Sequence, residues 1–509
     1  MWAVACVALL ATTPAVAQSA MNTRLAILLA LERGATSAAD LRTLRTGTRS
    51  GNSDVARLAY RSLGRLSRPT LVADILPGLR HALPEVRADA ADALAQSLAG
   101  SPATGTARTS ALATVQDALT ARLTVEADGL VRAVLRESLA RLPYARAADV
   151  AAAARTIREA SRADAQDRLG TARGLEAIIR THGALLPPES DTLDTLRALS
   201  AGPLAGDARD ARVRRVAVDG LIQARAVDDA LVSRLMADAD AQVRQRAMRA
   251  VAAGDLDGEA LRRGLADASP GVRLEALRGL ASRNSPALCG AAIGAAYDAD
   301  LTTALGAVDL LARCGQLPEA ILYLETAMAD RTDINEPRAW QRSAHALVAL
   351  AVAAPDRIGD RLDDYARSSL WPVRRHAVRA AAALNRRETL DRLAIDPESE
   401  VANAARVALG FAGLPEPTRK AVTLRVSAND LRRLAAPRAR VTVRDVGRFE
   451  IALLAEEAPF TVLRFVELAE SGYYNGATFD AITANATAQA GDRADEPASY
   501  PRTDRKSVV

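Results

Sequence analysis

A short pattern of apolar and polar positions recurs along most of the chain. A capping residue is followed three positions later by an apolar anchor, then by Ala or Leu at plus four and Leu or Val at plus eight. This spacing places the apolar residues on one stripe of a helix. The anchors are Val55, Val86, Val131, Val213, Val243, Val272, Leu301, Val373 and Val401.

The caps and the period predict how each repeat is built. Asn, Asp or Ser three residues before the anchor is a suitable N-cap, which predicts that a helix starts there. These caps are Asn52, Asp128, Asp210, Asp240, Ser269 and Asp298. Between Val213 and Leu301 the anchors repeat about every 30 residues, which is room for two short antiparallel helices. One such unit cannot bury its own stripe, so the sequence predicts a mainly α fold in which the units stack as a solenoid.

The Val-Arg pair and the Asp/Pro turn of this pattern resemble the HEAT and HEAT-like repeat family. The resemblance covers roughly residues 35–415, although the units at 140–205 and 315–365 match poorly. It implies an α-α superhelix that presents a binding surface, without specifying what binds.

Composition agrees with close-packed helices. Apolar residues make up 49% of the chain and aromatic residues only 3%, so the core must consist of Ala, Leu and Val. The net charge is +5, and Arg alternates with Asp and Glu without forming a basic stripe, which argues against nucleic-acid binding. The four histidines, His81, His182, His345 and His376, fit no metal-ligand spacing. We therefore expect no metal, no cofactor and no catalytic group within the repeats.

The first 17 residues resemble a secretory signal peptide. An apolar run through Leu10 precedes a small-residue site at 15–17, although no basic residue comes before the run. A lipid anchor at Cys6 is the alternative. No other segment has the roughly 18 uncharged apolar residues that span a bilayer. The sequence predicts an exported protein, periplasmic or extracellular.

Two cysteines remain after this segment, Cys289 and Cys314. If they lie at the two ends of one helical hairpin, the start of the first helix lies beside the end of the second, and a disulfide can form in an oxidising compartment. The alternative is a pair of small buried apolar side chains.

The periodicity changes after Pro417. Two runs of alternating residues, 441–443 and 449–454, flank Gly447 and predict two strands. An amphipathic helix follows over 459–474, which Gly472 ends. A second, α+β domain is therefore predicted over residues 438–503.

This region resembles the start of the cyclophilin family of peptidyl-prolyl cis-trans isomerases. The matching residues are Ala458, Pro459, Thr461, Val462 and Phe465, then Gly472-Tyr473-Tyr474-Asn475-Gly476 and Phe479, and finally Gln489, Gly491 and Asp492. The resemblance implies the first part of a β-barrel that binds proline-containing peptides, with Phe479 and Gln489 as the candidate peptide-binding residues.

Two positions depart from the family pattern. Ala481 stands where the family has its catalytic Arg, and Ala486 stands where it has an aromatic pocket residue. Rotation about the peptide C–N bond has a barrier of about 18–20 kcal/mol. The family's Arg is thought to weaken the conjugation of this bond through a hydrogen bond to the prolyl nitrogen, which Ala cannot provide. We therefore expect little or no isomerase activity.

The end of the chain raises a separate expectation. Residues 504–509 match what a common sequencing adapter encodes, and the family's barrel needs further strands beyond Val509. We expect a non-native tail on an incomplete domain; a natural short tail is the alternative.

Two functions follow from these observations. The first is a cyclophilin-type isomerase whose HEAT-like region binds proteins, acting on exported proteins, with its catalytic part incomplete here. The second is a non-catalytic HEAT-repeat scaffold. In both, the partners are proteins or proline-containing peptides, and the sequence leaves the oligomeric state open.

Overall fold

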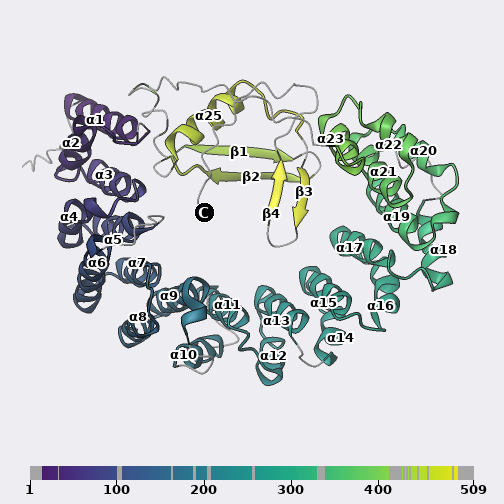
Figure 1. Cartoon of the computed structure of the whole chain (residues 1–509), viewed down its shortest axis with the longest axis horizontal. Helices are drawn as coiled ribbons and strands as arrows, with labels where there is room; N and C mark the ends of the chain where they lie inside the picture. The colour runs from purple at the N-terminus through teal and green to yellow at the C-terminus, as the bar shows by residue number, and fades with distance from the viewer. Residues whose placement is uncertain are drawn as a thin grey trace, which may run out of the picture. The chain divides into compact units, whose positions relative to one another are not determined.

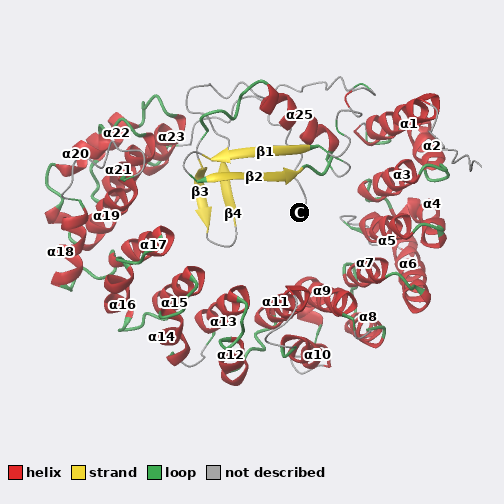
Figure 2. Ribbon diagram, turned by 180° about the vertical axis from the view of Figure 1, so that it is seen from behind, coloured by secondary structure: helices red, strands yellow, loops and turns green. Residues whose placement is uncertain are grey.

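The chain is mainly α-helical in its computed structural model (Figures 1 and 2). The structure describes residues 14–32, 34–99, 106–161, 164–186, 191–202, 208–254, 258–328, 339–411, 437–443, 446–455, 458–477, 479–483 and 487–490, together with residues 427, 430 and 434. The chain divides into two compact units. Unit 1 is residues 1–226 with 423–473, and unit 2 is residues 227–422 with 474–509. The signal-like residues 1–13 and the predicted tail lie outside the described residues.

Unit 1 contains the first set of helical repeats. Its helices are α1 (Pro14–Glu32), α2 (Ala38–Gly47), α3 (Ser53–Arg65), α4 (Val72–Ile75), α5 (Pro84–Leu98), α6 (Thr106–Val125), α7 (Gly129–Ala140), α8 (Ala147–Glu159), α9 (Ala165–His182), α10 (Asp191–Ser200) and α11 (Ala208–Gln223), with the 3-10 helices η1 (Pro69–Leu71), η2 (Leu76–Arg80) and η3 (Gly183–Leu185). The helices α3, α5, α7, α9 and α11 pack on one another in that order. α1 packs on α2 and α3 through buried residues such as Ile27, so the helical array begins before residue 35.

Unit 2 continues with the same architecture. Its helices are α12 (Asp229–Leu235), α13 (Ala241–Ala253), α14 (Glu259–Leu265), α15 (Pro270–Ser282), α16 (Leu288–Ala295), α17 (Leu301–Leu311), α18 (Pro318–Ala327), α19 (Trp340–Ala353), α20 (Arg361–Ala366), α21 (Trp371–Ala383), α22 (Arg387–Leu393) and α23 (Ser399–Ala408), with the 3-10 helix η5 (Pro355–Arg357). The helices α13, α15, α17, α19, α21 and α23 pack on one another in order, and each also packs on the helix before it. Both units are stacks of two-helix repeats, which confirms the predicted α-solenoid.

Seven of the nine predicted anchors are the third residues of their helices, as the pattern predicts; Val213 is the sixth residue of α11 and Leu301 the first residue of α17. In α3 the N-cap Asn52 accepts a hydrogen bond from the backbone N–H of Val55 (3.2 Å), and in α13 Asp240 accepts one from Val243 (3.0 Å). The valine anchors Val55, Val86, Val131, Val213, Val243, Val272, Val373 and Val401 are all at most 2% exposed. The cap and the buried anchor together fix where each helix starts.

One repeat lies two residues away from its predicted register. The N-cap of α17 is Asp300, not Asp298, and it accepts a hydrogen bond from the N–H of Thr303 (2.8 Å). Thr303 is fully buried at the anchor position, whereas Leu301 is 46% exposed. The pattern requires an apolar residue at the anchor, so it predicted Leu301 rather than Thr303. The hydroxyl of Thr303 can be buried because it donates a hydrogen bond to Asp300.

Two other predicted caps also differ. Asp210 is not an N-cap, because α11 already begins at Ala208; it lies in the first turn and pairs with Arg168. Ser269 is the N-cap residue of α15, but its hydroxyl makes no capping hydrogen bond. Pro270 at the first helical position, which needs no N–H partner, therefore contributes to starting this helix.

The poorly matched region 140–205 contains a regular repeat helix, α9, with a polar anchor. Its N-cap is Asp164, and its third residue, in the place of the usual valine, is Asp167. Asp167 is fully buried. It accepts hydrogen bonds from Nη1 and Nη2 of Arg136 (2.9 and 2.8 Å) and from Nε of Arg132 (2.7 Å). A search for apolar anchors misses this helix because an ion cluster replaces the hydrophobic contact.

The Arg that follows the anchor forms a ladder between neighbouring repeats. Arg244 donates from Nε and Nη2 to both oxygens of Asp267 in the next repeat (2.7 and 2.8 Å), and from Nη1 to the carbonyls of Asp238 and Ala239. Asp267 also accepts from the backbone N–H of Ser269 (2.8 Å). Further ladder pairs include Arg87–Glu126, Arg273–Asp298 and Arg374–Asp396. Each pair ties the turn of one repeat to the turn of the next.

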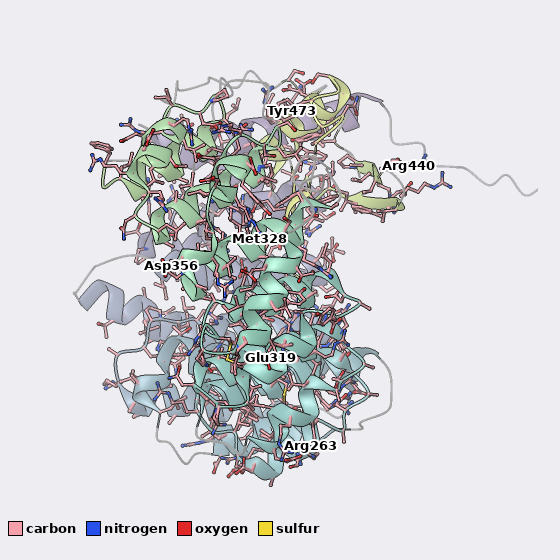
Figure 3. All side chains as sticks on the ribbon, turned by 90° about the vertical axis from the view of Figure 1, so that its right-hand side faces the viewer. Arg263, Glu319, Met328, Asp356, Arg440 and Tyr473 are labelled. Atoms are coloured by element: carbon pink, nitrogen blue, oxygen red, sulfur yellow. A yellow bond between two sulfur atoms is a disulfide. The ribbon has the colours of Figure 1, made fainter. Side chains whose placement is uncertain are left out.

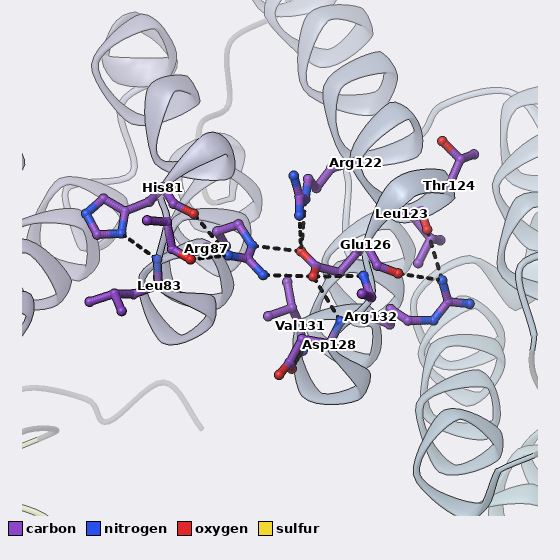
Figure 4. A network of polar contacts seen from close by, with 12 residues as sticks. His81, Leu83, Arg87, Arg122, Leu123, Thr124, Glu126, Asp128, Val131 and Arg132 are labelled. Carbon is purple, nitrogen blue, oxygen red and sulfur yellow. Dashed lines mark hydrogen bonds and ion pairs between the residues drawn. The ribbon is translucent and has the colours of Figure 1, made fainter.

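Glu126 is the most enclosed acid of this ladder (Figure 4). It accepts Nε and Nη2 of Arg87 (both 2.8 Å), two nitrogen atoms of Arg122, and the backbone N–H groups of Ala127 and Asp128 (both 3.0 Å). Burial alone would raise the pKa of Glu126. The hydrogen bonds from Arg87, Asp128 and Arg122 outweigh burial and lower the pKa to about 2.

Replacing Glu126 with Gln is expected to lower the free energy of unfolding by about 2 kcal/mol near neutral pH. The folded pKa of about 2 lies below the ordinary glutamate pKa of 4.5, so this stabilisation is complete above pH 4.5 and is lost as the pH falls from 4.5 towards 2. Urea titrations across this range should show the difference between the two proteins shrinking. Glu137→Gln, at a half-exposed pair with Arg173, is the control and should change little. A difference that stays constant down to pH 2 would contradict this electrostatic account.

The C-terminal segment forms small elements of a different kind. In unit 1, strands β1 (Arg438–Val443) and β2 (Gly447–Ala452) pair antiparallel, and α25 (Pro459–Glu470) follows. In unit 2, strands β3 (Phe479–Thr483) and β4 (Thr487–Ala490) pair antiparallel. The predicted strand pair around Gly447 and the following amphipathic helix are both confirmed, and the sheets are two-stranded and open.

The structure joins Cys289 and Cys314 in a disulfide, with their Cα atoms 5.7 Å apart. Cys289 is the second residue of α16, and Cys314 lies just after the end of α17. The two helices form an antiparallel hairpin, which brings the start of one beside the end of the other. Of the two alternatives left by the sequence, the structure has the disulfide.

Candidate functional site

The candidate site residues lie on the β3–β4 hairpin. The backbones of Ala481 and Gln489 are paired directly, and Phe479 is paired with Ala490, with an irregularity in the register between Phe479 and Ala481. Phe479 is 37% exposed and Gln489 is exposed. The hairpin therefore brings the three residues into one short stretch of sheet. Ala486 lies outside the described residues, as do residues 491–492.

Two side chains of this hairpin carry groups that can contact a peptide. Gln489 supplies an amide that can donate to and accept from a peptide backbone, and Phe479 supplies an aromatic ring. The described residues of β3 and β4 include no Arg, Lys or His. Removing one preorganised donor from an active site costs on the order of a hundredfold or more in rate. From the sequence, Ala481 is predicted to stand at the position of the family's catalytic Arg, and an Ala side chain carries no such donor.

The turn before β3 is built as the sequence predicts. α25 starts with Pro459 at its first position and ends where Gly472 adopts a φ of +78°, a conformation that favours glycine. The N–H of Tyr473 bonds back to the carbonyl of Leu468 (2.9 Å), closing the helix end. Val462 of α25 is buried in a small cluster with Leu434 and Leu463.

The β1–β2 hairpin has one charged face and one apolar face. Arg440, labelled in Figure 3, lies on the charged face and donates to Glu450 across the strands (2.9 Å). Phe449 and Ile451 on the apolar face are 48% and 40% exposed. This face resembles a sheet surface that normally packs against another layer.

The histidines make hydrogen bonds and ring contacts. Nε2 of His182 bonds the carbonyl of Leu142 (2.9 Å), and the His81 ring accepts from the N–H of Leu83 (3.1 Å). His345 and His376 have ring centroids 4.8 Å apart. Among the residues that the structure describes, no group of three or more His, Cys, Asp or Glu side chains is arranged to hold a metal ion. Within the same residues, no helix is long and apolar enough to cross a membrane.

A groove of about 640 Å³ lies within unit 2 beside α18. Its walls include Pro318, Glu319 (Figure 3) and Leu322, whose side chain is 64% exposed. Glu325 and Arg357 pair at one wall, 3.4 Å apart. The described lining residues include no Ser, Cys or His, and the two carboxylates are those of Glu319 and Glu325.

Residues 438–507 match the family model of the cyclophilin type peptidyl-prolyl cis-trans isomerase/CLD. The C-terminal segment is cyclophilin-like. The match begins at the first residue of β1 and includes both hairpins and α25. It also extends into residues 504–507, which belong to the segment predicted to be non-native. The cyclophilin-like segment therefore contains Phe479, Ala481 and Gln489. No curated protein matches the chain.

The helical part is similar to solved karyopherin structures. Kap95p, in a structure with RanGDP, aligns with a TM-score of 0.51 and 14% identity over 78% of this chain and 61% of that chain. Kap121p bound to the extreme C-terminus of the protein phosphatase Cdc14p aligns with a TM-score of 0.42 and 13% identity over 79% and 49%. The chain thus spans only about half to three-fifths of the length of these proteins. At such identities the likeness to Kap95p shows the α-solenoid fold alone.

Proposed function

We propose that the chain is a protein-binding α-solenoid of the peptidyl-prolyl isomerase group, whose cyclophilin-like segment engages proline-containing segments of exported proteins. The observation that carries this proposal is the cyclophilin match at residues 438–507 in one chain with two-helix repeats. Kap95p, which has a similar fold, contacts a protein partner, RanGDP. The solenoid would hold the partner, and the segment would bind its X-Pro sites.

The residues at the β3–β4 hairpin limit how fast the chain can catalyse isomerisation. Ala481 offers no donor to the prolyl nitrogen, while Gln489 and Phe479 can still bind a peptide. Binding that does not favour the twisted transition state over the planar ground state leaves the rate unchanged. We therefore propose that the chain binds proline-containing peptides and accelerates their isomerisation weakly or not at all.

A proline-peptide assay tests both parts of this proposal. We expect the unmodified chain to leave the isomerisation rate at its uncatalysed value, whereas anisotropy of a labelled Ala-Pro peptide rises on binding. Phe479→Ala combined with Gln489→Ala should weaken binding about tenfold. Phe449→Ala, at an exposed ring on the other hairpin, is the matched control and should leave binding unchanged. Clear catalysis by the unmodified chain contradicts the second part, and absence of peptide binding contradicts the first.

The second candidate function is a pure interaction scaffold in which the cyclophilin-like segment only supports structure. Ala481 favours this reading because it removes the catalytic donor. Ala481→Arg distinguishes the two functions. A gain in isomerisation rate would show that the frame of the active site is otherwise present, and no gain together with no proline-peptide binding would favour the scaffold.

We also propose that the chain is exported. The signal-like residues 1–17 and the disulfide between Cys289 and Cys314 support this location, because disulfides persist in oxidising compartments. The thiol state of both cysteines in the chain recovered from cells tests the proposal, since free thiols would count against it.

A further inference from the structure

Two consecutive stacking helices of unit 2, α19 and α21, place a group of basic and aromatic side chains together. The His345 and His376 rings lie 4.8 Å apart, and the ring of Trp340 lies 5.7 Å from that of His376. Arg342 is one turn before His345 on α19, and Arg379 is one turn after His376 on α21. With Arg375, these residues form what we call the Arg-His face.

The arginines of the Arg-His face are not neutralised. Among the residues that the structure describes, Arg342, Arg375 and Arg379 take part in no ion pair. Arg379 and Arg375 are four residues apart and so share one side of α21. Arg379 is exposed, and the other two are partly exposed.

Arginines at the stacking helices of unit 1 behave differently. Arg57 and Arg61 both pair with Asp89 of the next stacking helix (2.8 and 2.9 Å), and Arg141 pairs with Asp92. Carboxylates of this chain therefore neutralise these three arginines. The Arg-His face differs in that three arginines without an ion pair among the described residues lie close together, which makes it a local excess of positive charge.

Two carboxylates next to the Arg-His face, Asp309 and Asp396, have other partners. Asp309 of α17 contacts Nδ1 of His345 (2.6 Å), and Asp396, before α23, is held by the ladder Arg374 (2.7 Å). They cannot also neutralise the three arginines without giving up these contacts. The positive charge is therefore available to another molecule.

His376 supplies shape rather than charge near neutral pH. His376 donates from Nδ1 to the carbonyl of Pro372 (2.8 Å). The pKa of His376 is lowered to about 4, chiefly by burial; the neighbouring His345 and Arg379 act in the same direction, while the Pro372 contact and Asp309 oppose them. A neutral imidazole beside Trp340 gives the centre of the face a flat, partly apolar surface, with guanidinium groups around it.

We propose that the Arg-His face docks an acidic, extended segment of a partner protein, with carboxylates on Arg342, Arg375 and Arg379 and an apolar side chain against Trp340. This inference deepens the proposed protein-binding function and rests on it. Arg and Trp are the residues most enriched at the energetic centres of protein interfaces, and Arg binds carboxylates through two parallel hydrogen bonds. Three arginines bordered by paired charges fit a short acidic segment better than a nucleic-acid backbone, which needs a longer basic track.

Titration of the full chain with a labelled ten-residue peptide of alternating Glu and Leu tests the proposal. We expect a rise in anisotropy at low salt, and a change in tryptophan emission, since Trp340 lies at the centre of the face. Arg342→Glu, Arg375→Glu and Arg379→Glu together should weaken binding about tenfold or more. The triple variant with Gln at the same three positions should weaken binding less. Because it introduces no negative charge, it still tests the proposal if the Glu variant does not fold.

The matched control is the triple variant Arg155→Glu, Arg212→Glu and Arg263→Glu. These arginines are exposed and lie on α8, α11 and α14, so the control has the same net charge without touching the Arg-His face. Equal loss of binding in the control, or no loss in the Arg-His variants, overturns the proposal. Tighter binding of a single-stranded oligonucleotide of equal charge also overturns it, in favour of a nucleic-acid surface. Proline peptides without acidic residues report separately on the cyclophilin-like segment.

Discussion

Replacing Asp167 with Ala is expected to lower the free energy of unfolding by about 3–5 kcal/mol, since it leaves buried arginines without their counter-ion. Arg136 and Asp167 are fully buried, and Arg132 is 3% exposed. Asp167 receives three of their nitrogen atoms within 2.9 Å. Without the carboxylate, the guanidinium groups would stay charged, because arginine does not deprotonate in proteins.

Chemical denaturation followed by circular dichroism measures this loss. Asp167→Asn keeps the shape of the side chain and should lose nearly as much, because charge rather than volume is removed. Asp149→Asn is the matched control: Asp149 pairs with Arg146, whose side chain is 78% exposed, and less than about 1 kcal/mol should be lost. A loss for Asp167→Ala no larger than that of the control would show that the cluster is not needed.

A further variant tests whether an apolar anchor can replace the ion cluster at the start of α9. Replacing Asp167 with Val, Arg136 with Leu and Arg132 with Met restores an apolar anchor to α9 and removes all three charges. Buried ion groups can often be exchanged for apolar residues without loss, so the triple variant should recover most of the stability. Recovery will be incomplete because Arg132 also satisfies the carbonyls of Leu123 and Glu126.

The repeat helices could be predicted from sequence wherever the third residue is apolar and the cap is Asn or Asp. The start of such a helix is determined by neighbouring residues, because the cap side chain accepts a hydrogen bond from a backbone N–H three residues away. The pattern fails at Thr303 and Asp167, where polar side chains occupy the buried anchor and are satisfied by other groups. Whether a buried polar residue has a partner is decided by tertiary contacts, and these do not appear in a local pattern.

The candidate site was predictable in part. Phe479, Ala481 and Gln489 are close in sequence, and one hairpin brings them together as the family pattern implies. Of the ladder, the sequence shows only the Arg that recurs after the anchor. The acidic partners could not be assigned, because each lies 22 to 39 residues further along the chain. The Arg-His face was not predictable, because Trp340 and His376 come from different repeats and meet only when α19 and α21 stack.

Removing the disulfide is the second change with a large expected effect. Replacing Cys289 and Cys314 with Ala should lower the free energy of unfolding by about 3 kcal/mol, because the bond closes a loop between residues 25 apart in sequence. Dithiothreitol should lower the stability of the unmodified chain by a similar amount. It should leave the stability of the double variant unchanged, so the double variant is the control for other effects of the reductant.

The position of the loss follows from the stacking of the repeats. In a solenoid each repeat contacts only its neighbours, so reduction should speed amide exchange in α16 and α17 first. Cys314 is fully buried and lies in the same core as Leu311 and Val308 of α17. If reduction leaves both the unfolding midpoint and the exchange in α16 and α17 unchanged, then packing alone holds this hairpin. The disulfide would then not be a stabilising adaptation to an oxidising compartment, and the export proposal would lose one of its two supports.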